Sequence, residues 1–213
     1  IDELGQLIGY RLTDPDNIVS VVPITGLNDS AILGMDQRVS SGVIYVITDD
    51  LSLLTIDTTT GATVLVKNLA LTGTSFAIDF NPTNANLRIV SNDNTSYVYN
   101  FVTNTLVSGT NVTYGAGDPQ FGTDPDITAA AHINNDNDPT TGTTLFVIDS
   151  ANNVLATQNT ATGVLTTVGN LTLNGIAFDV TPEAGFDIVT NGVVNTAYVR
   201  SGGGVYMLNL VTG

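Results

Sequence analysis

The feature that most constrains this chain is a short turn motif that recurs along it. Each copy begins with Asp or Asn, whose side chain can accept hydrogen bonds from backbone amides two residues further on, and most copies end in Gly or Asn, which tolerate positive φ. Strand-like segments flank every copy, as residues 51–56 and 62–66 do around one of them, so each motif is predicted to join the strands of a β-hairpin. The motif occupies residues 57–61, 100–104, 159–163 and 209–213, with a looser copy at 14–17.

The spacing of these motifs predicts a repeat unit the size of a propeller blade. Their first residues are 14, 57, 100, 159 and 209, so the shortest interval is 43 residues. Two further strand candidates lie between successive hairpins, for example residues 75–78 and 87–90, which gives four short strands per unit. If the strands are labelled a to d, the chain follows the order c-d, three complete units, then a-b-c. We therefore predict an all-β fold in which residues 1–213 form a single small β-propeller-like repeat domain, with four to five blades of antiparallel strands.

The incomplete first and last units leave two interpretations of how the blades are completed. In the first, strands outside residues 1–213 complete them. In the second, a neighbouring copy supplies the absent strand, because an unpaired strand edge is a template for pairing.

The composition agrees with an all-β chain and excludes several classes of partner. Abundant Thr, Asn and Gly favour strands and tight turns over helices. With 5 basic and 20 acidic residues the net charge is −15, so the basic clusters that bind phosphate are lacking and we expect no nucleic-acid partner. No apolar run is long enough to insert into a membrane. The chain has no Cys, which excludes disulfides and thiol chemistry.

Low charge combined with many Thr, Asn and Gly residues is typical of bacterial surface and matrix proteins. Charged residues are 12% of the chain, about half of the usual share in globular domains. We therefore expect a secreted protein that works outside the cell or at its surface.

Three stretches of the chain resemble an uncharacterised bacterial family of secreted, propeller-like repeat domains, classed as a domain of unknown function. They are DTTTG at residues 57–61, GTSFAIDFNP at 73–82 followed by LRIVS at 87–91, and LATQNTATG at 155–163. The resemblance covers nearly the whole chain in order. It implies a propeller-like fold and an extracytoplasmic location, and it transfers no catalytic or binding residues.

One ionisable residue recurs at the end of each predicted strand a. Innermost strands line the channel of a propeller, so equivalent positions are expected to form a ring that could hold a cation, either Ca²⁺ or a transition metal if the imidazole joins. The alternative is that each Asp caps the turn that follows, which the sequence favours. Asp179 competes for the fourth place, but its distance to the next hairpin fits less well. The candidate ligands are Asp36, Asp79, His132 and Asp187.

A second candidate for Ca²⁺ is the polar segment of residues 134–138, which carries Asn134, Asp136 and Asp138 at alternate positions. Alternating oxygen ligands begin the calcium loop of an EF-hand. The pattern then fails, because Pro139 stands where that loop needs Gly and Leu145 where it needs Glu. A polar surface loop is the favoured interpretation. A third acidic cluster, Asp118, Asp124 and Asp126, is equally well explained as a connection between blades.

Catalysis finds little support in the sequence. There is one His and no Cys, and no nucleophile elbow is present.

The leading functional prediction is a non-enzymatic, extracellular scaffold or adhesive module. Its partners would be other copies of itself or matrix components, and strand complementation would join the copies head-to-tail. The alternative is a monomeric propeller that binds a glycan, a peptide or Ca²⁺. Tyr99, Tyr114 and Phe121 are candidate exposed aromatics for such a site, although aromatics in strands more often belong to the core. A metal-dependent hydrolase or lyase ranks last.

Overall fold

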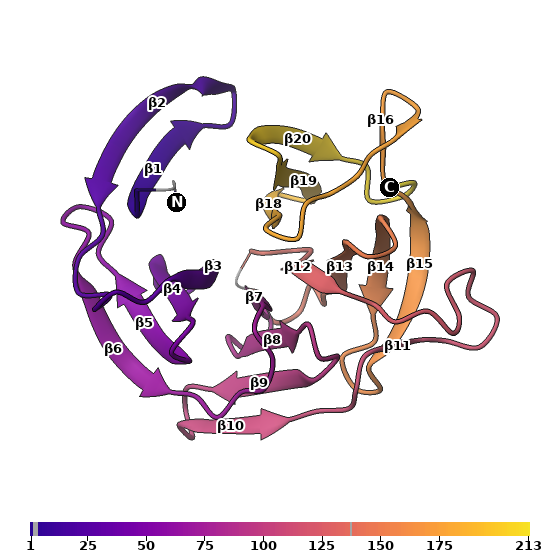
Figure 1. Cartoon of the computed structure of the whole chain (residues 1–213), viewed down its shortest axis with the longest axis horizontal. Helices are drawn as coiled ribbons and strands as arrows, with labels where there is room; N and C mark the ends of the chain where they lie inside the picture. Colours follow the sequence, from indigo (N-terminus) through magenta and orange to yellow (C-terminus); the bar gives the residue numbers. More distant parts are fainter. Residues whose placement is uncertain (2–3, 137) are drawn as a thin grey trace. The chain divides into compact units, whose positions relative to one another are not determined.

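The computed structural model describes residues 1, 4–136 and 138–213, and within these residues it contains twenty β-strands and no helix (Figure 1). The described chain therefore also has no helix that is long and apolar enough to cross a membrane. Internal contacts divide it into a first unit, Ile1–Leu71, and a second unit, Thr72–Gly213. Each unit is described by itself. The prediction of one domain over residues 1–213 concerns how the units combine and stays a prediction.

The first unit consists of a hairpin followed by a four-stranded antiparallel sheet. Its core is formed by Val46, Leu54 and Ile56 of the sheet, against which Leu7 of the hairpin and Ile32 pack. The hairpin comprises β1 (Gln6–Arg11) and β2 (Asp14–Pro23), and the sheet has the order β3 (Ile32–Arg38), β4 (Val43–Thr48), β5 (Ser52–Ile56) and β6 (Thr63–Asn68).

The second unit contains three antiparallel sheets in succession. The first is β7 (Phe76–Phe80), β8 (Leu87–Ser91), β9 (Ser96–Asn100) and β10 (Thr105–Ser108). The second is β12 (Ile127–His132), β13 (Leu145–Asp149), β14 (Val154–Gln158) and β15 (Val164–Asn170), with β11 (Thr113–Tyr114) added in parallel beside β15. The third is β18 (Gly185–Asn191), β19 (Val194–Ser201) and β20 (Gly204–Leu208), and a small hairpin of β16 (Thr172–Leu173) and β17 (Ile176–Ala177) precedes it.

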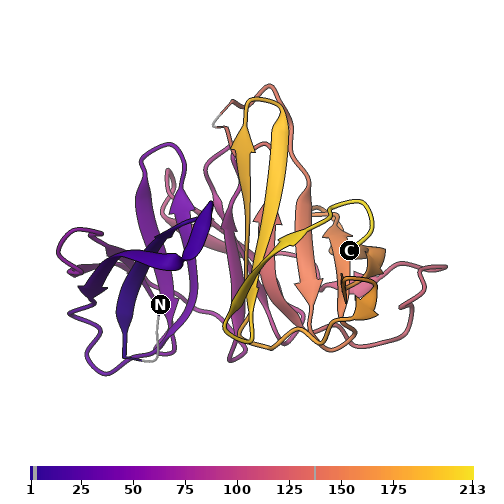
Figure 2. The ribbon, with the colours of Figure 1, turned by 90° about the horizontal axis from the view of Figure 1, so that it is seen from above.

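The sheets of the second unit are arranged like the blades of a propeller. Their first strands, β7, β12 and β18, lie innermost and later strands lie further out (Figure 1), while Figure 2 shows β18 and β19 as a long hairpin. Over both units the strands follow the predicted order, which is c-d, three complete sets and a-b-c. The predicted fold class, all-β and propeller-like with antiparallel blades, is confirmed.

Burial on both faces explains why the strands of the middle blade lack a simple alternation of polar and apolar residues. One core cluster joins the first and second sheets of the second unit, with Val90 and Val147 at its centre. Another, around Ile148, Leu155 and Val199, joins the second sheet to the third. Each blade of this unit is thus stabilised by the apolar surface it shares with its neighbour.

The recurring turn motif forms the predicted hairpin turns. In the copy at residues 159–163, Asn159 Oδ1 accepts hydrogen bonds from the backbone amides of Ala161 (3.0 Å) and Thr162 (3.1 Å). Gly163, at φ +75°, then donates its amide hydrogen bond to the Asn159 carbonyl at 2.8 Å. Asp57, Asn100 and Asn209 accept equivalent bonds in the other copies.

The glycine of this motif also lies against the chain that leaves the preceding blade. A Cβ on Gly163 would stand 2.2 Å from the Asn111 carbonyl oxygen, and one on Gly61 would stand 1.9 Å from that of Pro23. The departing chain then pairs in parallel with the new outer strand, since Thr113 donates its backbone amide to the Gly163 carbonyl at 3.2 Å. Glycine is required here both by the positive φ and by the close approach of a second backbone.

The looser motif at residues 14–17 does not form a turn, and this prediction is wrong. The turn lies at Leu12 and Thr13, while Asp14 already pairs with Arg11 as the first residue of β2.

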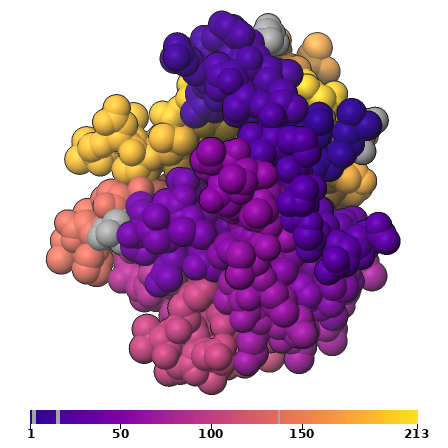
Figure 3. All heavy atoms as spheres, turned by 90° about the vertical axis from the view of Figure 1, so that its left-hand side faces the viewer, coloured from indigo at the N-terminus to yellow at the C-terminus, as the bar shows by residue number. Residues whose placement is uncertain are grey.

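The outer strand β6 of the first unit carries apolar side chains that are exposed to solvent. Val64 and Leu65 on β6 are 64% and 56% exposed. Figure 3 shows the surface of the first unit in indigo and purple.

A buried hydrogen bond links β11 to the end of β13 in the second unit. The Tyr114 hydroxyl donates to Asp149 Oδ2 at 2.6 Å, and the Asp149 side chain is inaccessible to solvent. Asp149 Oδ1 accepts from the amides of Asp126 and Ala151. Burial and the neighbouring carboxylate raise the pKa of Tyr114 well above its usual value, so this hydroxyl keeps its proton and remains a donor.

Substituting Gly163 tests the requirement for glycine at the turn. We expect Gly163→Ala to destabilise the protein by about 2–4 kcal/mol, because the methyl group adds a backbone clash to the strain of positive φ. The matched control is Gly192→Ala, since Gly192 also has positive φ but nothing within 4 Å of the added Cβ, and it should cost only about 1 kcal/mol. Urea denaturation measures both, and equal losses would contradict this role of the close approach.

Removing the Tyr114 hydroxyl tests the bond to Asp149. Tyr114→Phe should lower the free energy of unfolding by about 1.5–3 kcal/mol, because it deprives a buried carboxylate of a donor. Tyr198→Phe, in a half-buried tyrosine of the same unit, should stay within about 0.5 kcal/mol of the parent protein. A similar stability of both variants in chemical denaturation would show that the bond contributes nothing.

Candidate functional site

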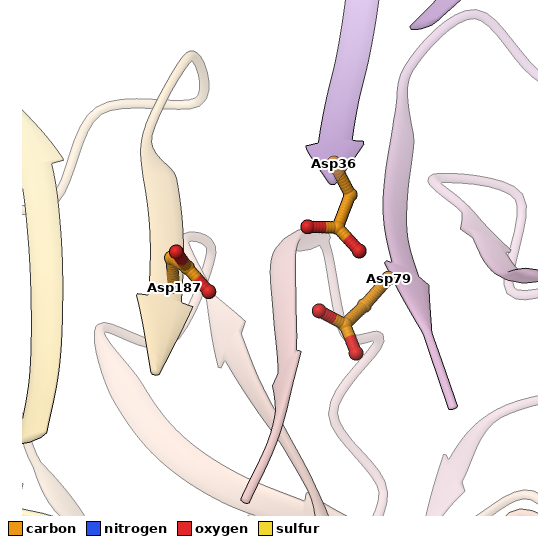
Figure 4. A group of neighbouring side chains, drawn as sticks. All are labelled: Asp36, Asp79 and Asp187. Atoms are coloured by element: carbon orange, nitrogen blue, oxygen red, sulfur yellow. The ribbon is translucent and has the colours of Figure 1, made fainter. Parts of the chain in front are cut away.

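The first strands of the sheets in the second unit carry three of the four residues predicted to form a cation ring. Asp79 lies on β7, His132 at the end of β12, and Asp187 on β18 (Figure 4 shows the two aspartates). Asp79 and Asp187 each place a carboxylate oxygen within 4.8 Å of the other's. Asp36 belongs to the first unit, where it lies on β3. The cation ring itself stays a prediction.

Asp79 and His132 contact one another directly although 53 residues separate them. Asp79 Oδ2 accepts a hydrogen bond from the backbone amide of His132 at 3.0 Å and also contacts Nδ1 of the imidazole ring. Both residues are buried, at 3% and 2% exposure. This contact ties the innermost strand of one blade to that of the next.

The alternative role as turn caps fits these aspartates poorly. The turn after β7 is capped by Asn81, whose Oδ1 accepts from the amide of Thr83 at 2.9 Å and from its hydroxyl at 2.7 Å. Asp36 and Asp187 each accept the amide of the next residue, at 2.7 Å, within their own strands. The cap of the turn after β7 is thus Asn81, while Asp79 is engaged by His132 of the next blade.

The His132 ring is neutral at physiological pH. Burial, together with the positive charge of nearby Arg88, lowers the pKa of His132 to about 3. A neutral imidazole has one N–H donor and one acceptor nitrogen. Since Nδ1 faces a carboxylate oxygen, Nδ1 carries the proton and Nε2 is left as the acceptor. Nε2 is buried and has no hydrogen-bond partner.

His132 also lines a polar pocket of the second unit with a volume of about 470 Å³. Its walls come from the ends of β12, β14 and β15 and from the loop before β13. Gln158 contributes a second buried polar atom without a partner, its Oε1. The described lining residues are Asn81, His132, Thr143, Thr144, Leu145, Thr157, Gln158, Asn159, Thr160, Val164 and Thr166.

Arg88 stands behind one wall of this polar pocket. Its Nη1 donates to the Ser96 hydroxyl at 3.0 Å and its Nη2 to the Thr160 carbonyl at 3.4 Å. Burial lowers the pKa of Arg88, but a guanidinium remains protonated in proteins. In the pairing of β7 with β8, Arg88 lies directly opposite Asp79. The guanidinium and the carboxyl group near the pocket therefore come from paired positions on neighbouring strands.

The oxygens of the second candidate, residues 134–138, serve the loop itself. Asp136 Oδ1 accepts from the Asp138 amide at 2.9 Å, and Asp138 Oδ1 accepts from the Thr140 amide at 2.8 Å. Asn134 Oδ1 accepts from the Asn195 side chain at 2.9 Å. Asn137 lies outside the described residues. A Ca²⁺ site at Asn134, Asp136 and Asp138 stays a prediction.

The third acidic cluster does not act as one group. Asp118 accepts from Thr167 on β15, Asp124 from the Asn94 side chain, and Asp126 from the Ser150 hydroxyl. Each carboxylate thus fastens a different part of the long loop before β12.

Of the three aromatic candidates, two are core residues, which is the alternative that their positions in strands favoured. Tyr99 is 2% exposed and Tyr114 is 4% exposed, because both pack into the core and use their hydroxyls internally. Phe121 is 63% exposed.

Sequence reasoning missed the polar pocket. Its walls combine segments between residues 81 and 166 that only the packing of two blades brings together. The one local signal is the run of polar residues 157–160, in which Gln158 is buried although it ends a strand.

The protonation of His132 predicts a pH dependence of stability. The unfolded ring binds a proton below its usual pKa of 6.5, whereas the folded ring stays neutral down to about 3. The free energy of unfolding should therefore be complete above pH 6.5 and fall as the pH drops, by at most about 1.4 kcal/mol per pH unit. Between pH 7.5 and 5.5, urea titrations should show this loss in the parent and not in His132→Asn. The same loss in both proteins would contradict a neutral His132.

One comparison with a solved structure supports the fold. The crystal structure of Myxococcus xanthus glutaminyl cyclase is similar to this chain with a TM-score of 0.54 at 12% identity, over 91% of this chain and 79% of that one. That likeness shows the fold alone. The computationally designed Ika4 protein has a TM-score of 0.44 at 16% identity, over 88% of this chain and 95% of that one.

An auxiliary nutrient binding protein from Bacteroides thetaiotaomicron VPI-5482 has a TM-score of 0.46 at 16% identity, over 78% of this chain. The match spans 44% of that protein, which is less than half of its length. Among curated protein sequences no relative matches the chain. The family model described as "Domain of unknown function (DUF4394)" matches residues 6–213. The resemblance of the repeat motifs to a propeller-like family of this kind is thus confirmed, and the chain belongs to the DUF4394 family.

Proposed function

We propose that this chain is a non-enzymatic, extracellular binding module whose polar pocket in the second unit takes a small polar ligand. The observation that carries the proposal is a pocket of about 470 Å³ whose described lining is mostly polar, with five threonines, two asparagines, Gln158 and His132. Hydroxyl and amide side chains both donate and accept hydrogen bonds. A small polar ligand in this pocket would find partners for its own donors and acceptors.

The pocket has the size and the rigid walls that ligand sites have. Sites for small molecules occupy about 300–1,000 Å³ and are largely formed before binding. Here the polar groups belong to strands β12, β14 and β15, whose backbones are fixed by pairing on both sides or by core packing. The site therefore needs little ordering on binding, which favours affinity.

A non-enzymatic role and an extracellular location are supported by composition. The chain has one His and no Cys, and the imidazole proton of His132 is engaged by buried Asp79. Low charge and abundant Thr, Asn and Gly are typical of surface proteins. Ca²⁺ binding by Asp79 and Asp187 of the second unit remains a further proposal.

A scaffold that assembles head-to-tail is the second candidate, and one observation favours it. Among the described residues, β20 pairs with β19 alone, and Met207 on β20 is 75% exposed. An unpaired edge of this kind can accept a strand from another copy or from a matrix component.

Filling the pocket tests the binding function. Thr166, an exposed residue of β15, lines the pocket, so Thr166→Phe should occlude it. Isothermal titration with neutral sugars, uronic acids, short peptides and Ca²⁺ should show at least one ligand whose affinity falls by tenfold or more in this variant. The matched control is Thr105→Phe, an exposed threonine of the equivalent strand β10, which should bind like the parent. Affinities that Thr166→Phe leaves unchanged would overturn the proposal.

A further inference from the structure

A second hollow of the second unit lies at the loop that joins β11 to β12, which Figure 1 shows on the outer side of this unit. It has a volume of about 450 Å³ and shares no described residue with the polar pocket. We call it the aromatic hollow. Its described lining is Thr113, Tyr114, Phe121, Gly122, Thr123 and Asp124.

Phe121 provides this hollow with an exposed aromatic ring. Each of the other phenylalanines of the chain is buried or half-buried, whereas Phe121 is 63% exposed. Most of this side chain is therefore open to a ligand. The face of an aromatic ring carries partial negative charge and attracts cations, Arg guanidinium groups in particular.

Asp124 adds a carboxylate to the same wall. The residue is exposed, and its Oδ1 accepts a hydrogen bond from Asn94 Nδ2 at 2.6 Å, which holds the side chain in place. Within the part of the chain that the structure describes, Oδ2 has no hydrogen-bond partner. This oxygen is available to a donor from another molecule.

The charges around the aromatic hollow are all negative. The segments that form its lining or contact it, residues 91–95, 113–126, 149–153 and 164–170, contain no Lys, Arg or His. Their acidic residues are Asp93, Asp118, Asp124, Asp126 and Asp149. An anion in the hollow would meet like charges, whereas a cation would gain a counter-charge.

An organic cation fits this wall better than a metal ion does. Ca²⁺ takes about six to eight oxygen ligands, but Asp124 is the one carboxylate in the described lining and the Phe121 ring offers no ligand atom. A guanidinium is planar, so it can lie on an aromatic ring while its N–H groups donate to a carboxylate. The ammonium group of lysine lacks this flat surface.

The ring and the carboxylate are held in place before any ligand binds. Asp118 accepts hydrogen bonds from the backbone amide and the hydroxyl of Thr167 on β15, both at 2.7 Å. Phe121 then donates its backbone amide to the Asp118 carbonyl at 3.0 Å. Because the loop is fastened to the sheet in this way, binding requires little ordering of it.

We infer that the aromatic hollow binds an arginine side chain of a peptide or protein partner. The guanidinium stacks on the Phe121 ring and donates to Asp124 Oδ2. This site is separate from the polar pocket and does not depend on the ligand proposed there.

Citrulline tests the charge of the ligand at constant shape, because it carries a neutral urea group where arginine has its guanidinium. We would titrate nitrogen-15-labelled protein with the capped peptide Gly-Ser-Arg-Ser-Gly and with its citrulline form, and follow the backbone amide signals. The arginine peptide should shift signals of residues 113–124 and bind about tenfold or more tightly than the citrulline peptide. Equal binding of the two peptides, or no binding of the arginine peptide, would overturn the inference.

The repeat supplies a matched control for the carboxylate. Asp124→Asn should weaken binding of the arginine peptide by about threefold or more. Asp179, also exposed, accepts a hydrogen bond from Asn153 Nδ2 at 3.0 Å, much as Asp124 does from Asn94, but it does not line the aromatic hollow. Asp179→Asn removes the same charge and should bind like the parent, so equal losses in the two variants would contradict the site.

Substitutions of Phe121 test the stacking. Phe121→Leu should weaken binding by about two- to fivefold, while Phe121→Tyr keeps a ring and should bind like the parent. Circular dichroism and the urea midpoint show whether each variant is folded, and an unchanged affinity in folded Phe121→Leu contradicts the inference.

The variant that fills the polar pocket distinguishes the two sites. Thr166→Phe should leave the affinity for the arginine peptide unchanged, because Thr166 does not line the aromatic hollow. A loss of affinity in this variant would place the peptide in the polar pocket, which would overturn the inference and leave the proposed binding function standing.

Discussion

The structure depends on a turn in which an Asx side chain and a glycine do separate tasks. The Asx oxygen closes the hairpin by accepting two backbone amides, as Asn159 does from Ala161 and Thr162. The glycine then allows the chain leaving the previous blade to pass at backbone distance, where a Cβ on Gly163 would collide with Asn111. Because that chain pairs in parallel with the new outer strand, one local motif both forms a blade and joins it to the blade before.

A second link joins blades at their inner strands, and it also shapes the candidate site. Asp79 on β7 holds both the backbone and the ring of His132 at the end of β12. The same contact that stabilises neighbouring blades thus fixes an imidazole with its acceptor nitrogen in a pocket wall. Stability and binding are coupled here, so substitutions at Asp79 should be interpreted with a measurement of folding beside any measurement of affinity.

The sequence was sufficient for features that depend on neighbours along the chain. Turn motifs at residues 57–61 and 159–163 contain their own hydrogen-bonding groups, so strand order and fold class followed from them. The turn predicted at residues 14–17 was wrong, because Asp14 pairs with Arg11 in the hairpin of β1 and β2. Which aromatics are exposed could not be decided from the sequence, since the buried hydroxyl of Tyr114 has its partner in Asp149, a residue 35 positions away.

The candidate site was predictable only in part. Equivalent positions in a repeat placed Asp79, His132 and Asp187 on successive inner strands, and the structure has them there. Their individual roles were not predictable, because the partner of Asp79 is chosen by packing between blades and not by the adjacent turn, which Asn81 caps. The polar pocket depends on the same packing, and no continuous segment of the sequence contains enough of its walls to reveal it.

The most direct test of the account is nitrogen-15 NMR of the imidazole ring. His132 is the sole histidine of the chain, so its ring signals need no assignment by mutation. The account predicts, at pH 7, a protonated Nδ1 with a pyrrole-type shift and an unprotonated Nε2 with a pyridine-type shift. The ring shifts should change when a ligand of the polar pocket binds, because His132 belongs to the pocket wall. A charged ring, or a proton on Nε2, would contradict the assignment of an acceptor in the pocket wall.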